Sequence, residues 1–342
     1  MRKSRRDTLI QLWGAAIESV SGEACVARAI SQDQLTSPDA IIAVGKAATG
    51  MCRGALDSFQ ETIPALVVTK YDHADQDLRD RANVTVIESA HPVPDEQSLI
   101  AGKALLAKVK AMPADSRLLL LVSGGASALA EALPTGTRLQ DLQETTDQLL
   151  AKGAAIGEIN RQRKASSEIK DGKLIEHFQG ESLQVYAISD VEGDEIATIG
   201  SGLGDCHRAQ TKASSRIIAS NHIARNSVVE LAGILDLVVR HNEETLYGDV
   251  FERAEMIAGT LDDAEPGLYI WGGEPTIVLP ANPGRGGRNQ SLALALSEQL
   301  CDRNDISVLV AGTDGTDGPT NAAGGIIDGD TFSDTDAAKT AL

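Results

Sequence analysis

The stretch Arg117-Leu-Leu-Leu-Leu-Val-Ser-Gly-Gly-Ala-Ser127 joins a continuous apolar run to a loop of glycine and serine. A strand that is apolar at every position from Leu118 to Val122 is typical of a parallel sheet covered on both faces. The two glycines expose backbone N–H groups, and a helix that begins after them favours a bound anion. The stretch predicts a buried strand whose carboxyl end carries an anion-binding loop; a tight turn capped by Ser127 is the alternative.

Short apolar runs alternate with helical patterns on both sides of this stretch. The expected strands cover residues 41–44, 65–69, 84–88 and 183–188. The expected helices cover residues 9–20, 96–110, 140–151 and 214–232. This alternation predicts an α/β fold, in which helices cover both faces of a parallel sheet.

The C-terminal part of the chain has a different pattern. Two short runs, 268–271 and 276–279, lie close together around a glycine pair and predict an antiparallel pair of strands. A helix is expected over 289–300 and a strand over 306–310. We therefore expect a boundary between 236 and 266, which divides an N-terminal domain, residues 1–240, from a smaller C-terminal domain, residues 241–342.

Composition limits the partners that this chain can bind. Its 342 residues suffice for two domains, and 31 Lys and Arg against 49 Asp and Glu give a net charge of −18. Such a charge argues against nucleic acid and anionic membranes as partners. The basic start of the chain precedes an amphipathic helix rather than the apolar core of a signal peptide, so we expect a cytoplasmic protein.

Several polar groups in the first half of the chain follow expected strands. Lys46 could neutralise a phosphate, or be a solvated lysine at a helix start. The segment Asn160-Arg-Gln-Arg-Lys164 could grip a carboxylate or phosphate, or be a solvated helix face. Asp190 could orient a hydroxyl, hold a metal ion or belong to an ordinary turn. We expect His91, between Ala90 and Pro92, to be packed and hydrogen-bonded.

Two glycine-rich motifs lie in the second half. Gly284-Arg-Gly-Gly-Arg-Asn-Gln290 precedes a helix, which predicts an anion site, and Arg288 there needs a compensating partner such as Glu274. The stretch Ala311-Gly-Thr-Asp-Gly-Thr-Asp-Gly-Pro-Thr-Asn-Ala-Ala-Gly-Gly325 contains five glycines and two carboxylates, Asp314 and Asp317. Carboxylates of this kind are ligands of Mg²⁺, although Asp-Gly pairs also form plain turns.

In this order, these motifs resemble those of the type 2 glycerate kinases, whose C-terminal portion is called the MOFRL domain. The matching segments are Ala43–Ala48, His91–Asp95, Ser123–Leu129, Ile159–Asn160 with Arg163–Lys164, Ser189–Asp190, Gly272–Glu274, Gly286–Gln290 and Ala311–Thr320. The resemblance implies a Rossmann-like domain and a smaller α/β domain with a mixed sheet. It also implies transfer of the γ-phosphoryl group of ATP to the 2-hydroxyl of D-glycerate, with Mg²⁺.

On this basis we assign roles to the motif residues. Catalysis is assigned to Lys46, Asp190 and Arg288, and the Mg²⁺ site to Asp314 and Asp317 with Glu274 in support. Binding of substrate or phosphate is assigned to Ser123, Gly124, Gly125, Ser127, Asn160, Arg163, Lys164, Gly286, Gly287 and Asn289. Which loop binds nucleotide and which binds the acid stays open, as does the choice between a monomer and a homodimer.

The sequence departs from the family pattern at several positions. The departures are Ala90, Ala126, Leu203 and Asn321, and the closing Thr-Gly-Pro-Thr-Gly-Thr-Asn type segment is not found before Leu342, so we expect it to be missing. Two alternatives to the kinase stay open: an NAD(P)H-dependent hydroxypyruvate reductase and a homologue that binds nucleotide with impaired catalysis. The reductase ranks lower because the chain contains no Gly-x-Gly-x-x-Gly fingerprint.

Overall fold

The structure, a computed structural model, describes residues 4–142, 144, 156–278, 284–329 and 331, with backbone alone for 156–160. The chain forms two compact units, which are described separately. The larger unit is Val20–Ser220. The smaller unit combines the segment that ends at Ser19 with the chain from Asn221 onward.

The larger unit is built on a six-stranded parallel sheet with the strand order β3-β2-β1-β4-β5-β6. The strands are β1 (Ala40–Val44), β2 (Ala65–Lys70), β3 (Val84–Ser89), β4 (Arg117–Val122), β5 (Ser182–Ile188) and β6 (Lys212–Ala219). This is the order of the Rossmann fold, in which the chain direction across the sheet reverses between β1 and β4. Ligands of such sheets bind beyond the carboxyl ends of the strands at that reversal.

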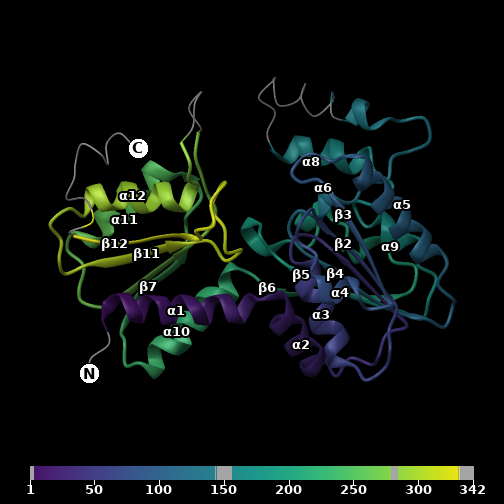
Figure 1. Ribbon diagram of the computed structural model, residues 1–342, viewed down its shortest axis with the longest axis horizontal. Coiled ribbons are helices and arrows are strands. Elements are labelled where there is room, and N and C mark those ends of the chain that lie inside the picture. Colours follow the sequence, from purple (N-terminus) through teal and green to yellow (C-terminus); the bar gives the residue numbers. More distant parts are fainter. Residues whose placement is uncertain (1–3, 143, 145–155, 279–283, 330, 332–342) are drawn as a thin grey trace. The chain divides into compact units, whose positions relative to one another are not determined.

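Helices cover both faces of this sheet (Figure 1). The helices of this unit are α2 (Gly22–Asp33), α3 (Ala48–Ser58), α4 (Gln76–Arg79), α5 (Glu96–Lys110), α6 (Ala126–Leu129), α8 (Ile156–Ala165) and α9 (Lys173–Glu176), and its short 3₁₀ turns are η1 (Glu192–Asp194), η2 (Ile199–Ser201) and η3 (Cys206–Arg208). Along β4, Leu119 and Leu121 face the core under α2 and α3, whereas Leu118 and Leu120 face the core under α5 and α9. The unbroken apolar run of β4 is therefore explained by burial on both sides.

The smaller unit contains short strand pairs, some parallel and one antiparallel. Its elements are α1 (Arg5–Val20), α10 (Asn221–Ile234), β7 (Val239–Glu244), β8 (Gly248–Asp249), α11 (Val250–Leu261), β9 (Leu268–Gly272), β10 (Pro275–Thr276), α12 (Arg288–Gln299), β11 (Ser307–Ala311) and β12 (Gly324–Asp328). The pairs β7–β9 and β8–β10 are parallel, and β11–β12 is antiparallel. Its strands lie between α11 and α12 on one side and α1 and α10 on the other (Figure 1). The expected α/β fold class is confirmed.

Some expected elements differ in the structure. The antiparallel pairing of 268–271 with 276–279 is wrong, because β9 pairs with β7 and β10 pairs with β8, both in parallel. The expected helix over 214–232 is wrong in its first part, where β6 forms the edge of the sheet. The expected helix over 140–151 lies mostly outside the described residues.

The units divide the chain at Ser220, earlier than the expected interval of 236–266. The reason is that α10 packs against β7 and β9 and so belongs to the smaller unit. No helix within the described residues combines the length and apolar character needed to cross a lipid bilayer.

Candidate functional site

The loops that follow β1 and β4 are bonded to each other at the reversal of strand order. The N–H of Lys46 donates to the carbonyl of Gly124 at 2.9 Å, and the N–H of Ala47 donates to Oγ of Ser123 at 3.1 Å. Gly45 has φ of +133°, and a Cβ there would lie 2.1 Å from Oγ of Ser123. Only glycine permits this approach of the two loops, which fixes the backbone of Lys46.

Gly124 and Gly125 bring together side chains from three other loops. A Cβ on Gly124 would lie 1.8 Å from Oδ2 of Asp190, which follows β5. A Cβ on Gly125 would lie 3.1 Å from both Cδ2 of His91, which follows β3, and Cγ of Lys46. The N–H groups of Gly124 and Gly125 make no hydrogen bond within the described residues. Two free amide donors thus lie beside the imidazole of His91, the carboxylate of Asp190 and the aliphatic stem of Lys46.

Lys46 is half-buried, and among the described residues its ammonium group has no hydrogen bond and no carboxylate partner. The ring of His91 is also half-buried and, within the same part of the chain, has no hydrogen-bond partner. Burial lowers the pKa of the His91 imidazole, and the ammonium groups of Lys46 and Lys70 lower it further. The expectation of a hydrogen-bonded His91 is therefore wrong for the described structure.

Ser127 does not cap the helix that follows the glycine pair. The residue before α6 is Gly125, which makes no side-chain cap, and the hydroxyl of Ser127 pairs with that of Ser201 at 2.8 Å. Sequence reasoning did not single out Ser201, although it lies between two glycines, Gly200 and Gly202, and has a positive φ of 58°. The sequence Gly-Ser-Gly could have indicated a tight turn at this edge of the sheet.

Arg163 and Lys164, two of the three cations of the α8 segment, differ in their partners. Nζ of Lys164 donates to the carbonyl of Ala197 at 2.8 Å and lies 3.9 Å from Oδ1 of Asp171. The half-buried guanidinium of Arg163 has no hydrogen bond or ion pair within the described residues. Asn160 lies in α8, but its side chain is outside the described part of the structure. Of the two cations, Arg163 is the one that remains available for an anion.

In the smaller unit, the carboxylate of Asp317 caps the N-terminus of α12. Asp317 is only 3% exposed, and it accepts the N–H groups of Asn289 at 3.1 Å and Gln290 at 2.8 Å. A Cβ on Gly287 would lie 2.3 Å from Oδ1 of Asp317, so glycine at this position leaves the space that the carboxylate occupies. Asp317 thereby satisfies two donors that a helix start leaves unpaired.

The other acidic groups of the smaller unit are placed differently. Arg288 forms an ion pair with Glu274, which is the compensating partner that the sequence suggested. Asp314 is exposed, and the N–H of Thr316 lies 3.5 Å from its Oδ1. No group of three metal-binding His, Cys, Asp or Glu side chains occurs among the described residues.

The capping role can be tested with a matched pair of variants in one loop. Asp317→Asn should lower the free energy of unfolding of the smaller unit by about 1–2 kcal/mol, since a charged cap of two N–H groups is lost. Asp314→Asn should leave that free energy unchanged because its side chain is exposed. Both tryptophans, Trp13 and Trp271, belong to the smaller unit, so their fluorescence in a denaturant titration reports its unfolding. Equal stabilities of the two variants would contradict the capping role.

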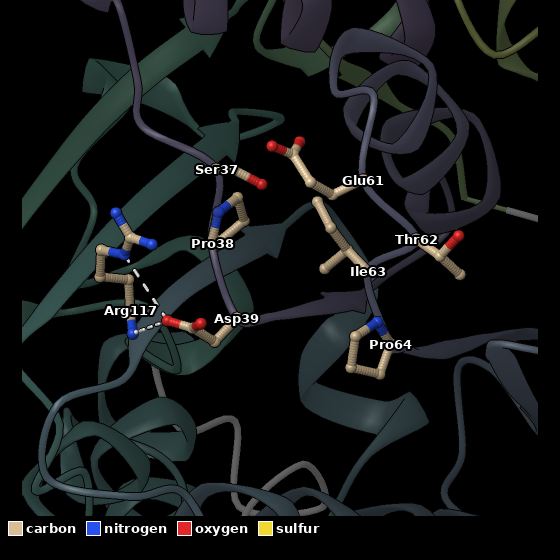
Figure 2. A pocket seen from close by; sticks show the side chains of 8 residues that line it. All are labelled: Ser37, Pro38, Asp39, Glu61, Thr62, Ile63, Pro64 and Arg117. Atoms are coloured by element: carbon tan, nitrogen blue, oxygen red, sulfur yellow. Dashed lines mark hydrogen bonds and ion pairs between the residues drawn. The ribbon is translucent and has the colours of Figure 1, made fainter.

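A hollow of about 270 Å³ lies at the opposite end of the large sheet (Figure 2). Its walls include Asp39 and Pro64, which precede β1 and β2, and Arg117, whose N–H donates to Asp39 at 2.8 Å. Ligands of open parallel sheets bind at the carboxyl ends rather than the amino ends of the strands. We therefore place the candidate site at the glycine pair and not in this hollow.

Residues 8–233 match DUF4147, a domain of unknown function, and residues 267–342 match the MOFRL family. The glycerate 2-kinase of Pyrococcus horikoshii is 32% identical to this chain, in an alignment that covers 85% of this chain and 76% of that protein. The chain belongs to the type 2 glycerate kinase family.

Further relatives are similar to this chain over most of its length. The D-glycerate 2-kinase of Thermotoga maritima is 31% identical, with 96% of this chain and 87% of that protein covered. The crystal structure of the glycerate kinase from the same organism has a TM-score of 0.85 at 29% identity and covers 98% of this chain and 89% of that one. A protein of Agrobacterium vitis, described as a putative hydroxypyruvate reductase, is 31% identical over 85% of this chain and 86% of its own length.

Proposed function

We propose that this protein is an ATP-dependent kinase that transfers the γ-phosphoryl group to the 2-hydroxyl of D-glycerate and forms 2-phosphoglycerate. The observation that carries the proposal is the half-buried Lys46, whose Cγ lies against Gly125 in the glycine pair with free N–H groups, and whose ammonium group has no carboxylate partner among the described residues. In a chain with a net charge of −18, such a group is suited to an anionic ligand.

Phosphoryl transfer depends on positioning and on stabilisation of the developing charge. We assign Lys46 to the charge on the transferred group, with the N–H groups of Gly124 and Gly125 as further donors. Hydrogen bonds fix the backbone of Lys46 to the β4 loop and so set the point from which its side chain extends toward the transferred group. Ser123 and Ser127 support this loop, and Arg163 is assigned to an acid or phosphate oxygen.

Asp190 is our candidate to orient or deprotonate the 2-hydroxyl of the acid. Its Oδ2 lies directly over Gly124, in the space that a Cβ would fill. A carboxylate at that place can accept the hydroxyl proton of an acid bound at the glycine pair. This role needs a glycine at position 124, since any side chain would displace the carboxylate.

The smaller unit supplies a second group of assigned residues. Arg288, on the first turn of α12, is assigned to the phosphoryl charge, and a bound phosphate would compete with Glu274 for its guanidinium. Among the three carboxylates assigned to Mg²⁺, exposed Asp314 suits the ion best, because Asp317 accepts backbone N–H groups and Glu274 pairs with Arg288. When bound, Mg²⁺ would neutralise phosphate charge.

A hydroxypyruvate reductase is the second candidate, because the strand order is also that of dinucleotide-binding sheets. The β1 loop, Gly45-Lys-Ala-Ala-Thr-Gly50, has alanine where the dinucleotide fingerprint has its second glycine. That glycine lets the backbone approach a pyrophosphate. The N–H of Ala47 is instead bonded to Ser123, which disfavours a dinucleotide at this loop.

An assay that follows both products separates the two candidates. With ATP, Mg²⁺ and D-glycerate, we expect one ADP for each glycerate consumed, and phosphorus NMR should show the phosphate on the 2-hydroxyl. L-Glycerate and tartronate serve as acceptor controls. Oxidation of NADH or NADPH with hydroxypyruvate, in the absence of ADP formation, would reject the kinase and support the reductase.

A further inference from the structure

The imidazole of His91 is the polar group at the glycine pair to which the proposed transfer gives no role. A Cβ on Gly125 would meet Cδ2 of His91 at 3.1 Å and its Nε2 at 3.3 Å, so the ring edge lies over that glycine. The ring nitrogens have no hydrogen-bond partner among the described residues. The ring is half-buried, and its nitrogens are not among the fully buried atoms that lack a partner, so a ligand that accepts its N–H would take the place of solvent.

The positions of His91 and Asp190 match the two functional groups of a 2-hydroxy acid. Asp190 lies over Gly124 and His91 lies over Gly125, and adjacent Cα atoms are about 3.8 Å apart. In a 2-hydroxy acid the hydroxyl is on C2, and the carboxylate carbon, C1, is directly bonded to C2. An acid whose hydroxyl faces Asp190 can therefore present its carboxylate toward His91.

We propose that His91 binds the carboxylate of the acceptor acid and so selects 2-hydroxy acids over neutral alcohols. This inference rests on the proposed kinase function and names the residue that recognises the acid. The ring donates one N–H to a carboxylate oxygen, and the ammonium of Lys46 is near enough to lower the pKa of the ring. Because burial and the neighbouring ammonium groups keep the pKa of His91 low, the ring is neutral near pH 7 and donates without adding a third cation.

The kinetic test compares His91→Gln with wild type. We expect the KM for D-glycerate to rise about tenfold or more, as for loss of a hydrogen bond to a charged group, while the KM for ATP stays within about twofold and kcat falls less than about threefold. The matched control is His222→Gln, an exposed histidine on α10 of the smaller unit, which should leave all three constants unchanged. An unchanged KM for glycerate, or a rise confined to the KM for ATP, would overturn the proposal.

A binding measurement without a variant separates this inference from the kinase function. The protein labelled on its histidine rings is titrated with D-glycerate alone and then with glycerol, which lacks the carboxylate. Glycerate, but not glycerol, should shift the ring signals that His91→Gln removes. If ADP is formed with glycerate but those signals do not move, the carboxylate contact is wrong and the kinase stands. If the signals move but no ADP forms, the contact stands and the kinase is wrong.

Discussion

Lys46→Ala is expected to lower kcat for glycerate phosphorylation by about 10²-fold or more, because it removes a preorganised positive charge from the transferred phosphoryl group. The backbone should keep its conformation, since the hydrogen bonds of this loop use the N–H of Lys46 and not its side chain. The measurement is the rate of ADP release at saturating ATP and glycerate. Lys110→Ala, which removes an exposed lysine at the end of α5, is the control and should keep full activity.

The same assay tests whether Arg288, like Lys46, stabilises the charge on the transferred phosphoryl group. Arg288→Ala should also lower kcat by about 10²-fold. If both cations stabilise one phosphoryl group, the double variant should lose less than the product of the two single losses, as for residues that act as a unit. Near-normal turnover in both single variants would refute the assignment of these cations.

The sequence predicts the carboxyl edge of the large sheet well because its signals are local. The apolar run of β4 and the adjacent glycine pair are contiguous, and they lie in the structure where the pattern places them. The edge strand β6 was mistaken for helix because its first half, Lys212 to Ser215, is largely polar and exposed. Edge strands carry a weaker apolar pattern than central ones, so periodicity alone does not identify them.

Contacts between distant residues explain why parts of the candidate site were not predicted. The helix cap made by Asp317 was not predicted, because its partner Asn289 is 28 positions away and no local pattern indicates the contact. The ring of His91 reaches Gly125 from the loop after β3, although β2 and β1 separate β3 from β4 in the sheet. That approach depends on strand order and loop path together, which residue spacing does not encode.

Breaking the buried ion pair between Glu131 and Lys170 is expected to cause the largest loss of stability. The two side chains are 0% and 1% exposed. The carboxylate of Glu131 also accepts the N–H of Ala132 at 2.9 Å and the hydroxyl of Ser167. Burial lowers the pKa of Lys170, and Glu131 opposes this by favouring the charged form. Glu131→Leu would leave a buried ammonium without its partner and should lower the free energy of unfolding of the larger unit by about 3–5 kcal/mol.

Two comparisons separate a charge effect from a packing effect in this variant. The double variant Glu131→Leu/Lys170→Met removes both charges and should recover most of the loss, since an apolar pair of similar volume replaces a buried ion pair at little cost. Asp57→Ala breaks the surface pair with Arg81, in which the side chain of Asp57 is 51% exposed and that of Arg81 is 34% exposed, and should cost less than about 1 kcal/mol. Both tryptophans belong to the smaller unit, so circular dichroism is followed in parallel to detect unfolding of the larger unit.

The loss in Glu131→Leu should also depend on pH in a definite direction. Without Glu131, the pKa of Lys170 in the folded protein lies further below its unfolded value of about 10.4, so the penalty of burying the ammonium is largest below the folded pKa. Above the folded pKa, Lys170 is neutral in the folded protein. As pH rises toward the pKa of Lys170 in the unfolded chain, the unfolded chain also loses this proton, so the penalty disappears. The stability gap to wild type should therefore be smaller at pH 9.5 than at pH 7, and a gap that is constant or grows with pH would show that lost packing, rather than the unpaired charge, causes the destabilisation.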